Sequence, residues 1–339
     1  MIKILICVGT RPEWLKIKPI VNLLDEDEYD LLFTGQHKDL LSEVNFKYKI
    51  VILGDGNRLS DIISSCLLSM PKLDYDYVLV QGDTASAFGC AISSFHNKVK
   101  IIHLEAGLRT YDNNNPYPEE SYRQMISRIS DINLCPTELS YNNLISEKVF
   151  GESYIVGNTV LDNIAKYKNL SEYGRNVLVT LHRRENHEIM DLWFKNLNIV
   201  AENNPNLNFI LPIHPNPNVL KHRHLLSPKI KVIEPLIHNE LIDILLNCRF
   251  VITDSGGIQE EATFFNKISI VCRKTTERPE GIETGHLKLC SEPNDLNYYV
   301  SNIANDNFRI DNICPYGDGE SSEKIIKILR NGNSSSKRI

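Results

Sequence analysis

Three groups of carboxylates between residues 81 and 120 stand where an α/β enzyme carries catalytic acids. Asp83 and Glu105 each follow an apolar, strand-like run, and Glu119 with Glu120 opens a helical pattern. In open α/β sheets the ligand lies at the carboxyl ends of the strands. Desolvation and mutual repulsion separate the pKa values of neighbouring carboxylates into acid and base roles. The pattern therefore predicts proton-transfer chemistry.

A glycine pair after a strand predicts phosphate binding in the second half of the chain. Ser255, Gly256 and Gly257 follow an apolar run and open a helical pattern. Glycines let backbone N–H groups approach a phosphate, and a helix N-terminus favours an anion by about 0.3–1 kcal/mol. A serine N-cap with a tight glycine turn explains the motif equally well. Glu261, one turn further, accepts ribose hydroxyls or is a solvated helix residue.

Two further strand ends carry histidine. His182 and Arg183 follow one apolar run, in positions to protonate or hold a leaving phosphate. The alternative is a surface turn with an incidental histidine. The spacing of His182 and His187 does not match a zinc-binding HExxH helix, so no metal site is expected. His214 follows another run and is interpreted as a wall of the cleft.

Cations after two more strands are further candidates. Arg11 and Lys16 lie at the start of the first helical pattern, where both can meet an anion, although an exposed arginine in a βα turn is the simpler explanation. Arg278 belongs to the charged segment Thr275–Gly281, directly after an apolar run. Charge runs are usually solvated, but one placed after a strand is a better site candidate.

Short β-rich runs alternate with amphipathic helical patterns, which predicts parallel sheets covered by helices. The predicted strands are Ile2–Val8, Tyr29–Phe33, Tyr48–Leu53, Tyr77–Val80, Val99–Leu104, Ile132–Leu134, Ser153–Val156, Val177–Thr180, Asn208–Ile213, Ile230–Ile233, Phe250–Thr253, Ile268–Val271 and Leu287–Cys290. We expect two Rossmann-like, doubly wound domains facing each other across a cleft: residues 1–166 with the acid/base groups and residues 167–319 with the nucleotide site. The charged segment Lys166–Asn176 is predicted as the linker. A last helix, Glu320–Leu329, is expected to pack back on the first domain before a frayed tail.

Composition excludes some classes of function. The 339 residues are 42% hydrophobic and 24% charged, as in soluble globular proteins, and a net charge of −6 provides no general basic field for nucleic acid. The eight cysteines form no CxxC pair, which favours free thiols in a reducing cytosol. No apolar run is long enough for a membrane span, so a cytoplasmic enzyme is expected.

Taken together, these motifs resemble the non-hydrolysing UDP-N-acetylglucosamine 2-epimerases of bacteria and archaea. The matching stretches run in the family's order from the first strand to about Gly285: Gly9–Glu13 with Lys16, Thr34–His37, Gln81–Thr84, Glu105–Arg109, Pro118–Glu120, Pro136–Glu138, Val156–Thr159, His182–Asn186, His214 with Asn216–Asn218, Asp254–Glu261 and Thr275–Glu280.

The resemblance implies a GT-B fold, a homodimer and inversion at C2 between UDP-GlcNAc and UDP-ManNAc. In this family a base removes the C2 proton as UDP departs, leaving a 2-acetamidoglucal. A proton then reaches the opposite face of C2, and UDP adds back. Neither a nicotinamide nor a metal is needed.

The resemblance also implies roles for individual residues. Asp83, Glu105 and Glu119 are expected as the catalytic carboxylates, with His182 beside the leaving phosphate. Arg11, His182 and Ser255–Gly257 would hold the phosphates, and Glu261 the ribose. Lys16, Arg183, His214 and Arg278 are expected to line the substrate site.

Two positions depart from the family pattern. Tyr122 stands where asparagine is usual, and Ser127 where aspartate is usual. Gln36, His37 and Arg183 match an activating second substrate site of some bacterial members, and the changed helix puts that regulation in question. The alternatives are an epimerase of a modified UDP-acetamido sugar, a hydrolysing 2-epimerase, a GT-B glycosyltransferase and an inert nucleotide-sugar-binding protein.

Overall fold

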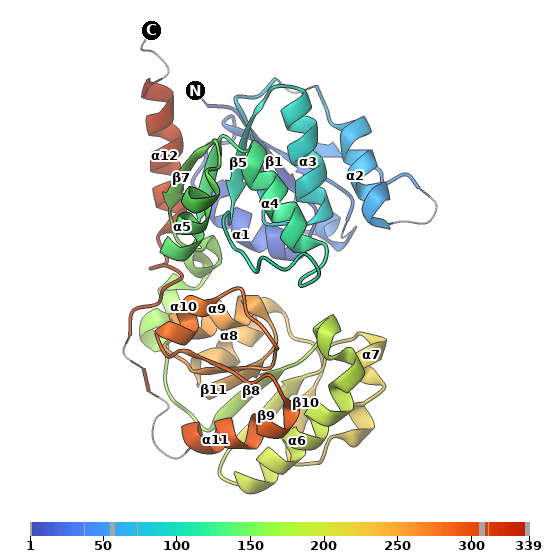
Figure 1. The fold of residues 1–339 in the computed structure, drawn as a ribbon, viewed down its shortest axis with the longest axis vertical. Helices are drawn as coiled ribbons and strands as arrows, with labels where there is room; N and C mark the ends of the chain where they lie inside the picture. Colours follow the sequence, from blue (N-terminus) through green and yellow to red (C-terminus); the bar gives the residue numbers. More distant parts are fainter. Residues whose placement is uncertain are drawn as a thin grey trace. The chain divides into compact units, whose positions relative to one another are not determined.

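The computed structural model describes residues 2–36, 38–54, 58–72, 74–304, 309–310 and 312–335. The chain forms two compact units, Met1–Asn163 together with Tyr316–Ile339, and Ile164–Pro315. It passes between the units twice, and the last segment, which includes the red helix α12 in Figure 1, belongs to the first unit. The boundaries expected from the sequence lie after residues 166 and 319.

A parallel sheet of seven strands, in the order β3-β2-β1-β4-β5-β6-β7, forms the centre of the first unit. Its strands are β1 (Ile4–Val8), β2 (Tyr29–Phe33), β3 (Tyr48–Lys49), β4 (Tyr77–Gln81), β5 (Lys100–Leu104), β6 (Ile132–Cys135) and β7 (Glu152–Ile155). The strand order reverses between β1 and β4. Loops that leave such a switch point diverge and open a crevice at the carboxyl edge of the sheet.

Helices cover both faces of this sheet. They are α1 (Arg11–Val21), α2 (Arg58–Ser69), α3 (Ala85–His96), α4 (Glu119–Ile129), α5 (Glu138–Glu147) and α12 (Ser321–Ser335), with 3₁₀ turns η1 (Lys38–Ser42) and η2 (Thr159–Asn163). Every residue of β1 is buried. Ile4 and Ile6 pack in one core with residues of α1 and α12, whereas Leu5 and Cys7 pack in a second core with α2 and α3. Successive side chains of a strand point to opposite faces of the sheet, and here both faces are covered by helices. A central strand is therefore apolar at every position.

The second unit has the same design, with six parallel strands in the order β10-β9-β8-β11-β12-β13 and a switch point between β8 and β11. Its strands are β8 (Asn176–Thr180), β9 (Asn208–Pro212), β10 (Ile230–Ile233), β11 (Cys248–Thr253), β12 (Ser269–Val271) and β13 (Leu287–Leu289). Its helices are η3 (Ala165–Leu170), η4 (Arg184–Ile189), α6 (Met190–Asn203), α7 (Pro217–Leu220), η5 (Arg223–Leu225), α8 (His238–Leu246), α9 (Gly256–Phe264), α10 (Pro279–Glu283), η6 (Pro293–Asp295) and α11 (Leu296–Ala304).

The predicted linker, Lys166–Asn176, is attached to the second unit rather than free. The buried Lys267 ammonium donates to the Glu172 carbonyl at 2.5 Å, and the Tyr173 hydroxyl donates to the Asn266 carbonyl at 2.7 Å. The first half of the segment forms η3 and the last residue begins β8. The polar composition of the segment predicted a linker. Its hydrogen-bond partners lie more than ninety residues away in the sequence, so no local pattern indicated that it is anchored.

Each predicted strand corresponds to an observed one, and the expected α/β class with two doubly wound parallel sheets is confirmed. Tyr48–Leu53 shortens to the two-residue edge strand β3, and beyond it Val51 and Leu53 are 69% and 63% exposed. The last helix extends past its predicted end at Leu329 to Ser335. No helix in the ranges given above is both long and apolar enough to cross a membrane.

Helix α12 is anchored by a carboxylate from a distant part of the first unit. Asp162 accepts the backbone N–H groups of Ser321 at 3.1 Å and Ser322 at 2.6 Å, which start the helix. The Asn158 N–H donates to the Tyr316 carbonyl at 2.7 Å. Because the first N–H groups of a helix have no partner within it, Asp162 supplies the cap from outside.

We expect Asp162→Ala to destabilise the first unit by about 1–2 kcal/mol, the usual cost of losing an N-cap. Amide hydrogen exchange should speed up in α12 before it does in β1. Asp318→Asn is the matched control, since Asp318 forms an exposed ion pair with Lys324 and its loss should cost less than about 0.5 kcal/mol. Equal effects of the two substitutions would contradict the capping role.

Candidate active site

A buried glutamate, Glu13, joins the two loops at the switch point of the first unit. Its carboxylate accepts the N–H groups of Gly9 at 2.5 Å and Thr10 at 3.2 Å, in a capping box at the start of α1. The Thr84 hydroxyl, in the loop after β4, donates to its other oxygen at 2.6 Å. Burial raises the pKa of Glu13, and these hydrogen bonds act in the opposite direction. Glu13 thus fixes the loops after β1 and β4 relative to each other.

Glu105 is the first residue after β5, and its backbone has a φ of +65°, which residues other than glycine rarely adopt. Lys16 Nζ lies 2.5 and 2.6 Å from its two oxygens. Gln81 Nε2 also donates to the carboxylate, and Asn158 Nδ2 lies 3.4 Å from it. Donors from α1, β4 and the segment after β7 therefore over-determine an unfavourable conformation, as is common at functional sites.

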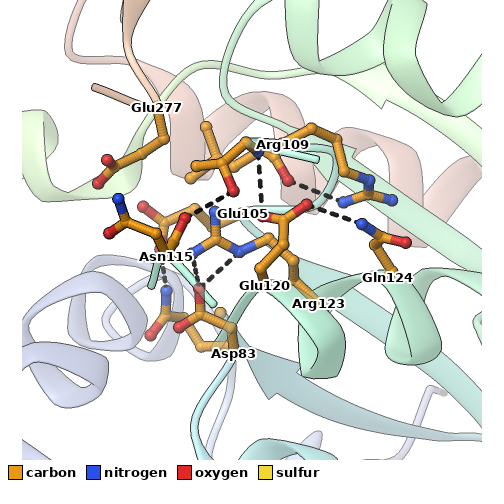
Figure 2. Close-up of polar contacts among 12 residues, drawn as sticks. Asp83, Glu105, Arg109, Asn115, Glu120, Arg123, Gln124 and Glu277 are labelled. Atoms are coloured by element: carbon orange, nitrogen blue, oxygen red, sulfur yellow. Dashed lines mark hydrogen bonds and ion pairs between the residues drawn. The ribbon is translucent and has the colours of Figure 1, made fainter. Parts of the chain in front are cut away.

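Arg123 on α4 connects two carboxylates (Figure 2). Its Nε donates to Asp83 Oδ2 at 2.8 Å, and its Nη1 lies 3.4 Å from Glu120 Oε2. Glu120 is fully buried and accepts the N–H groups of Thr110 at 3.0 Å and Tyr111 at 3.1 Å. The Asp83 side chain keeps 25% of its surface exposed. The arginine therefore orients Asp83 without covering it.

Two residues predicted for this half lie outside the networks of Lys16, Asp83 and Glu105. Glu119 is the first residue of α4 and is half-buried, and no described side chain or N–H forms a hydrogen bond or ion pair with it. Arg11 is exposed and pairs with Glu43. Glu119 is thus the least constrained of the three predicted carboxylates.

In the second unit a buried carboxylate, Asp254, organises the loop after β8. Asp254 directly follows β11 and accepts the backbone N–H of His182 at 2.9 Å, that of Arg183 at 2.9 Å and Asn186 Nδ2 at 3.0 Å. Asn186 also donates to the Cys272 carbonyl at 2.9 Å. The backbone that carries His182 and Arg183 is therefore held rigidly.

The imidazole rings of His182 and His214 stack with centroids 4.9 Å apart and planes 14° apart. Desolvation lowers the pKa of both histidines, and for His182 the nearby Asp254 carboxylate partly opposes that shift. The His182 side chain retains 32% exposure. The structure thus brings together two predicted site residues as a partly accessible pair that favours the neutral form.

The loop after β11 leads into the N-terminus of α9. Ser255 occupies the N-cap position, but its hydroxyl makes no capping hydrogen bond, so the simple N-cap explanation lacks its defining contact. A Cβ on Gly256 would lie 2.6 Å from the Arg278 guanidinium, whereas a Cβ on Gly257 would meet no described atom within 4 Å. A side chain at Gly256 would therefore have to displace the buried Arg278 guanidinium, whereas Gly257 leaves space in front of the helix N-terminus.

Arg278 supports this loop from inside the unit. It is buried, and its Nε donates to Glu260 Oε1 at 2.6 Å. Glu277 accepts from Arg278 and, at 2.9 Å, from Arg273. Arg183, by contrast, has a buried Nε without a partner among the residues that the structure describes.

Glu261 on α9 has a partner that sequence reasoning missed. His238 Nε2, at the start of α8, lies 2.7 Å from Glu261 Oε1. This hydrogen bond raises the pKa of His238 above its ordinary value, and burial acts in the opposite direction. The pair therefore favours an imidazolium bound to a carboxylate at the predicted ribose position.

Other missed residues are Gln81, Arg123 and Asn158. A spacing signal existed only for Arg123, which follows Glu119 by one helical turn. Gln36, from the matched activating site, accepts a hydrogen bond from the Ser86 hydroxyl at 2.7 Å, and His37 lies outside the described residues. Within the described ranges, no group of three or more His, Cys, Asp or Glu side chains is arranged to hold a metal ion.

Comparisons with known proteins agree on one family. The sequence profile described as UDP-N-acetylglucosamine 2-epimerase matches residues 23–330. A UDP-N-acetylglucosamine 2-epimerase of Campylobacter jejuni is 38% identical over 377 residues, covering 97% of this chain and 98% of the relative. One from Bacillus subtilis is 33% identical over 361 residues, covering 97% and 95%.

A solved structure extends the similarity to the fold. The UDP-GlcNAc 2-epimerase of Neisseria meningitidis, crystallised with UDP-GlcNAc, matches with a TM-score of 0.87 and 31% identity over 97% of this chain and all of that one. The family profile covers most of the sequence, and the two relatives each cover 97% of it. This chain belongs to the UDP-N-acetylglucosamine 2-epimerase family.

Proposed function

We propose that this enzyme interconverts UDP-N-acetylglucosamine and UDP-N-acetylmannosamine without hydrolysing the sugar–phosphate bond, and so supplies cell-surface polysaccharide synthesis. The observation that carries the proposal is the set of strand-end carboxylates, Asp83 and Glu105, each held by a cation in a chain of this family. Such groups match a reaction in which protons leave and return at one carbon.

The proposed reaction is an elimination followed by a re-addition. A base takes the C2 proton, the C1–O bond breaks with its electron pair going to UDP, and C1=C2 of a 2-acetamidoglucal forms. An acid then protonates the other face of C2, and a phosphate oxygen of UDP attacks C1. The sequence of steps is redox-neutral, which is why the proposal includes no nicotinamide, and it includes no metal.

The carboxylates are proposed to divide this work. Asp83, Glu105 and Glu119 are the acid/base candidates, and a positioned group of this kind contributes about 10²–10⁴-fold to the rate. The ammonium of Lys16 forms an ion pair with Glu105. Glu119 has the most freedom to exchange a proton with the sugar.

The second unit is proposed to hold the UDP. The N-terminus of α9, with Ser255–Gly257, offers N–H groups and a favourable dipole to the phosphates. His182 and Arg183 would stabilise the charge that develops on the leaving UDP, together with Arg11 once it releases Glu43. Glu261 would accept the ribose hydroxyls, while His214 and the buried Arg278 support these groups.

A homodimer in a reducing cytoplasm completes the proposal. All eight cysteines are free and buried, as suits a compartment in which disulfides do not persist.

Incubation with UDP-GlcNAc alone in D₂O tests the reaction. We expect a mixture of UDP-GlcNAc and UDP-ManNAc in which both sugars carry deuterium at C2. Free N-acetylmannosamine with UDP would identify a hydrolysing enzyme instead. Conversion only after an acceptor is added would identify a glycosyltransferase, and UDP-sugar binding without C2 exchange would identify an inert binding protein.

We expect Asp83→Asn and Glu105→Gln each to lower kcat by about 10²–10⁴-fold, because each removes an acid/base group. C2 deuterium exchange and product formation should fall together, while UDP affinity stays the same. Glu26→Gln is the matched control, since it removes an exposed carboxylate of the first unit. Wild-type turnover in either active-site variant would exclude that residue from the chemistry.

Gly257→Ala separates phosphate binding from packing. The added methyl meets no described protein atom and replaces a helical glycine, so stability should stay constant or rise by about 0.4–1 kcal/mol. UDP affinity, measured by calorimetry, should fall about tenfold or more if a phosphate approaches this backbone. Gly256→Ala, which clashes with Arg278, should instead lower stability. Unchanged UDP affinity in Gly257→Ala would contradict the phosphate site.

The His238–Glu261 pair predicts a pH-dependent stability. The folded pKa of His238 is raised above 6.5, so the pair stabilises the fold fully below pH 6.5 and loses this contribution as pH rises through the folded pKa. His238→Gln should therefore reduce the unfolding free energy by roughly 1.5–3 kcal/mol at pH 5.5 and by much less at pH 9. His224→Gln, at an exposed histidine of the same unit, is the control. A pH-independent difference would refute the ion pair.

A further inference from the structure

His103 is a fully buried histidine on β5, two residues before Glu105, and no step of the proposed reaction uses it. Its Nε2 lies 2.9 Å from the carbonyl oxygen of Gly82, and its Nδ1 lies 3.3 Å from the Ser127 hydroxyl. Within the described part of the chain these are its hydrogen-bond partners. Gly82 directly precedes Asp83, and Ser127 lies one helical turn after Arg123 on α4.

The partners determine which nitrogen of His103 carries the proton. A carbonyl oxygen only accepts, so Nε2 must be the N–H donor. Burial lowers the pKa of His103 to about 4, with Arg109 and Arg123 adding to the shift and the Gly82 hydrogen bond and Glu105 opposing it. The ring is therefore neutral near pH 7, and Nδ1 remains an acceptor facing Ser127.

Gly82 is held on both sides by β5. Its N–H donates to the Leu104 carbonyl at 2.9 Å, and its own carbonyl accepts from His103. Its φ of +67° is a conformation that glycine adopts readily. Because a peptide unit is planar, fixing the Gly82 carbonyl fixes the plane that leads into Asp83.

The second partner of His103 is Ser127, which also contacts Arg123, the cation of the Asp83–Arg123 ion pair. The Ser127 hydroxyl lies 2.9 Å from the carbonyl oxygen of Arg123, one turn earlier on α4. Arg123 Nε in turn lies 2.8 Å from Asp83 Oδ2. The Ser127 hydroxyl has one proton, which it donates either to the Arg123 carbonyl or to His103 Nδ1. The contact with Gly82 is therefore the fixed hydrogen bond of the imidazole, and Ser127 packs between the ring and the backbone of α4.

We propose that His103 is a positioning residue for this reaction: its Nε2–H holds the Gly82–Asp83 peptide so that the Asp83 carboxylate meets Arg123 and the substrate carbon in a fixed place. His103 itself touches no substrate. The inference rests on the proposed function, because it assigns Asp83 to the chemical step.

Substitutions that differ in reach test the proposal. Glutamine carries an amide N–H₂ to where the imidazole Nε2 lies, whereas the shorter asparagine is polar but does not reach Gly82. His103→Leu fills the volume without a donor. We expect His103→Gln to retain kcat within about tenfold, and His103→Asn and His103→Leu to lose about 100-fold, the cost of a small misplacement of a catalytic group.

Binding and coupling distinguish positioning from general damage. UDP affinity should be unchanged in all three variants, since most of the proposed phosphate site, α9 with His182 and Arg183, lies in the other unit. Adding His103→Asn to Asp83→Asn should lower kcat little further, because coupled residues are not additive. Wild-type kcat in His103→Leu, equal losses in the glutamine and asparagine proteins, or full additivity with Asp83→Asn would overturn the proposal.

A spectroscopic readout keeps the inference testable if a variant does not fold. Long-range ¹H–¹⁵N NMR of the wild-type protein should show His103 as the neutral Nε2–H tautomer at pH 7, and an Nδ1–H tautomer or an imidazolium would overturn the assignment. Wild-type C2 exchange in D₂O is measured first. Its absence refutes the proposed function, whereas its presence together with wild-type kcat in His103→Leu refutes only the positioning role.

Discussion

A carboxylate buried at the edge of a parallel sheet is stable only when hydrogen-bond donors surround it, and the site depends on this constraint. Glu13 joins the loops after β1 and β4, Glu120 binds the loop before α4, and Asp254 binds the loop after β8. Each one uses backbone N–H groups as donors. The same contacts that make the buried acids tolerable therefore fix the loops that carry the functional residues.

The two units apply this arrangement to different chemistry. The switch point of the first unit gathers carboxylates with cations beside them, as in the pairs Lys16–Glu105 and Arg123–Asp83. The switch point of the second unit has stacked imidazoles and a helix N-terminus with open space at Gly257. The proposed proton transfer needs the first environment and the proposed anionic leaving group needs the second, so one fold used twice would supply both requirements.

Position at a strand end was the signal that selected many of the candidate site residues. Asp83, Glu105, His182 and Ser255 all directly follow or nearly follow apolar runs, and parallel strands bring such positions to one edge. Their partners carried no comparable signal. His103 and Asn158 lie in stretches whose local pattern indicates only a strand or a loop, because the contacts that give them a role join residues 21 and 53 positions apart.

The sequence by itself determined the α/β class, the strands and the edges where a ligand would bind, because hydrophobic periodicity and strand-end polarity are local properties. Only the tertiary structure decided that Lys166–Asn176 is anchored to the second unit, that Arg278 is buried beneath Gly256, and that Arg123 is the partner of Asp83. Those outcomes depend on which surfaces meet when helices pack on the sheets, and packing between distant segments leaves no trace in the spacing of residues along the chain.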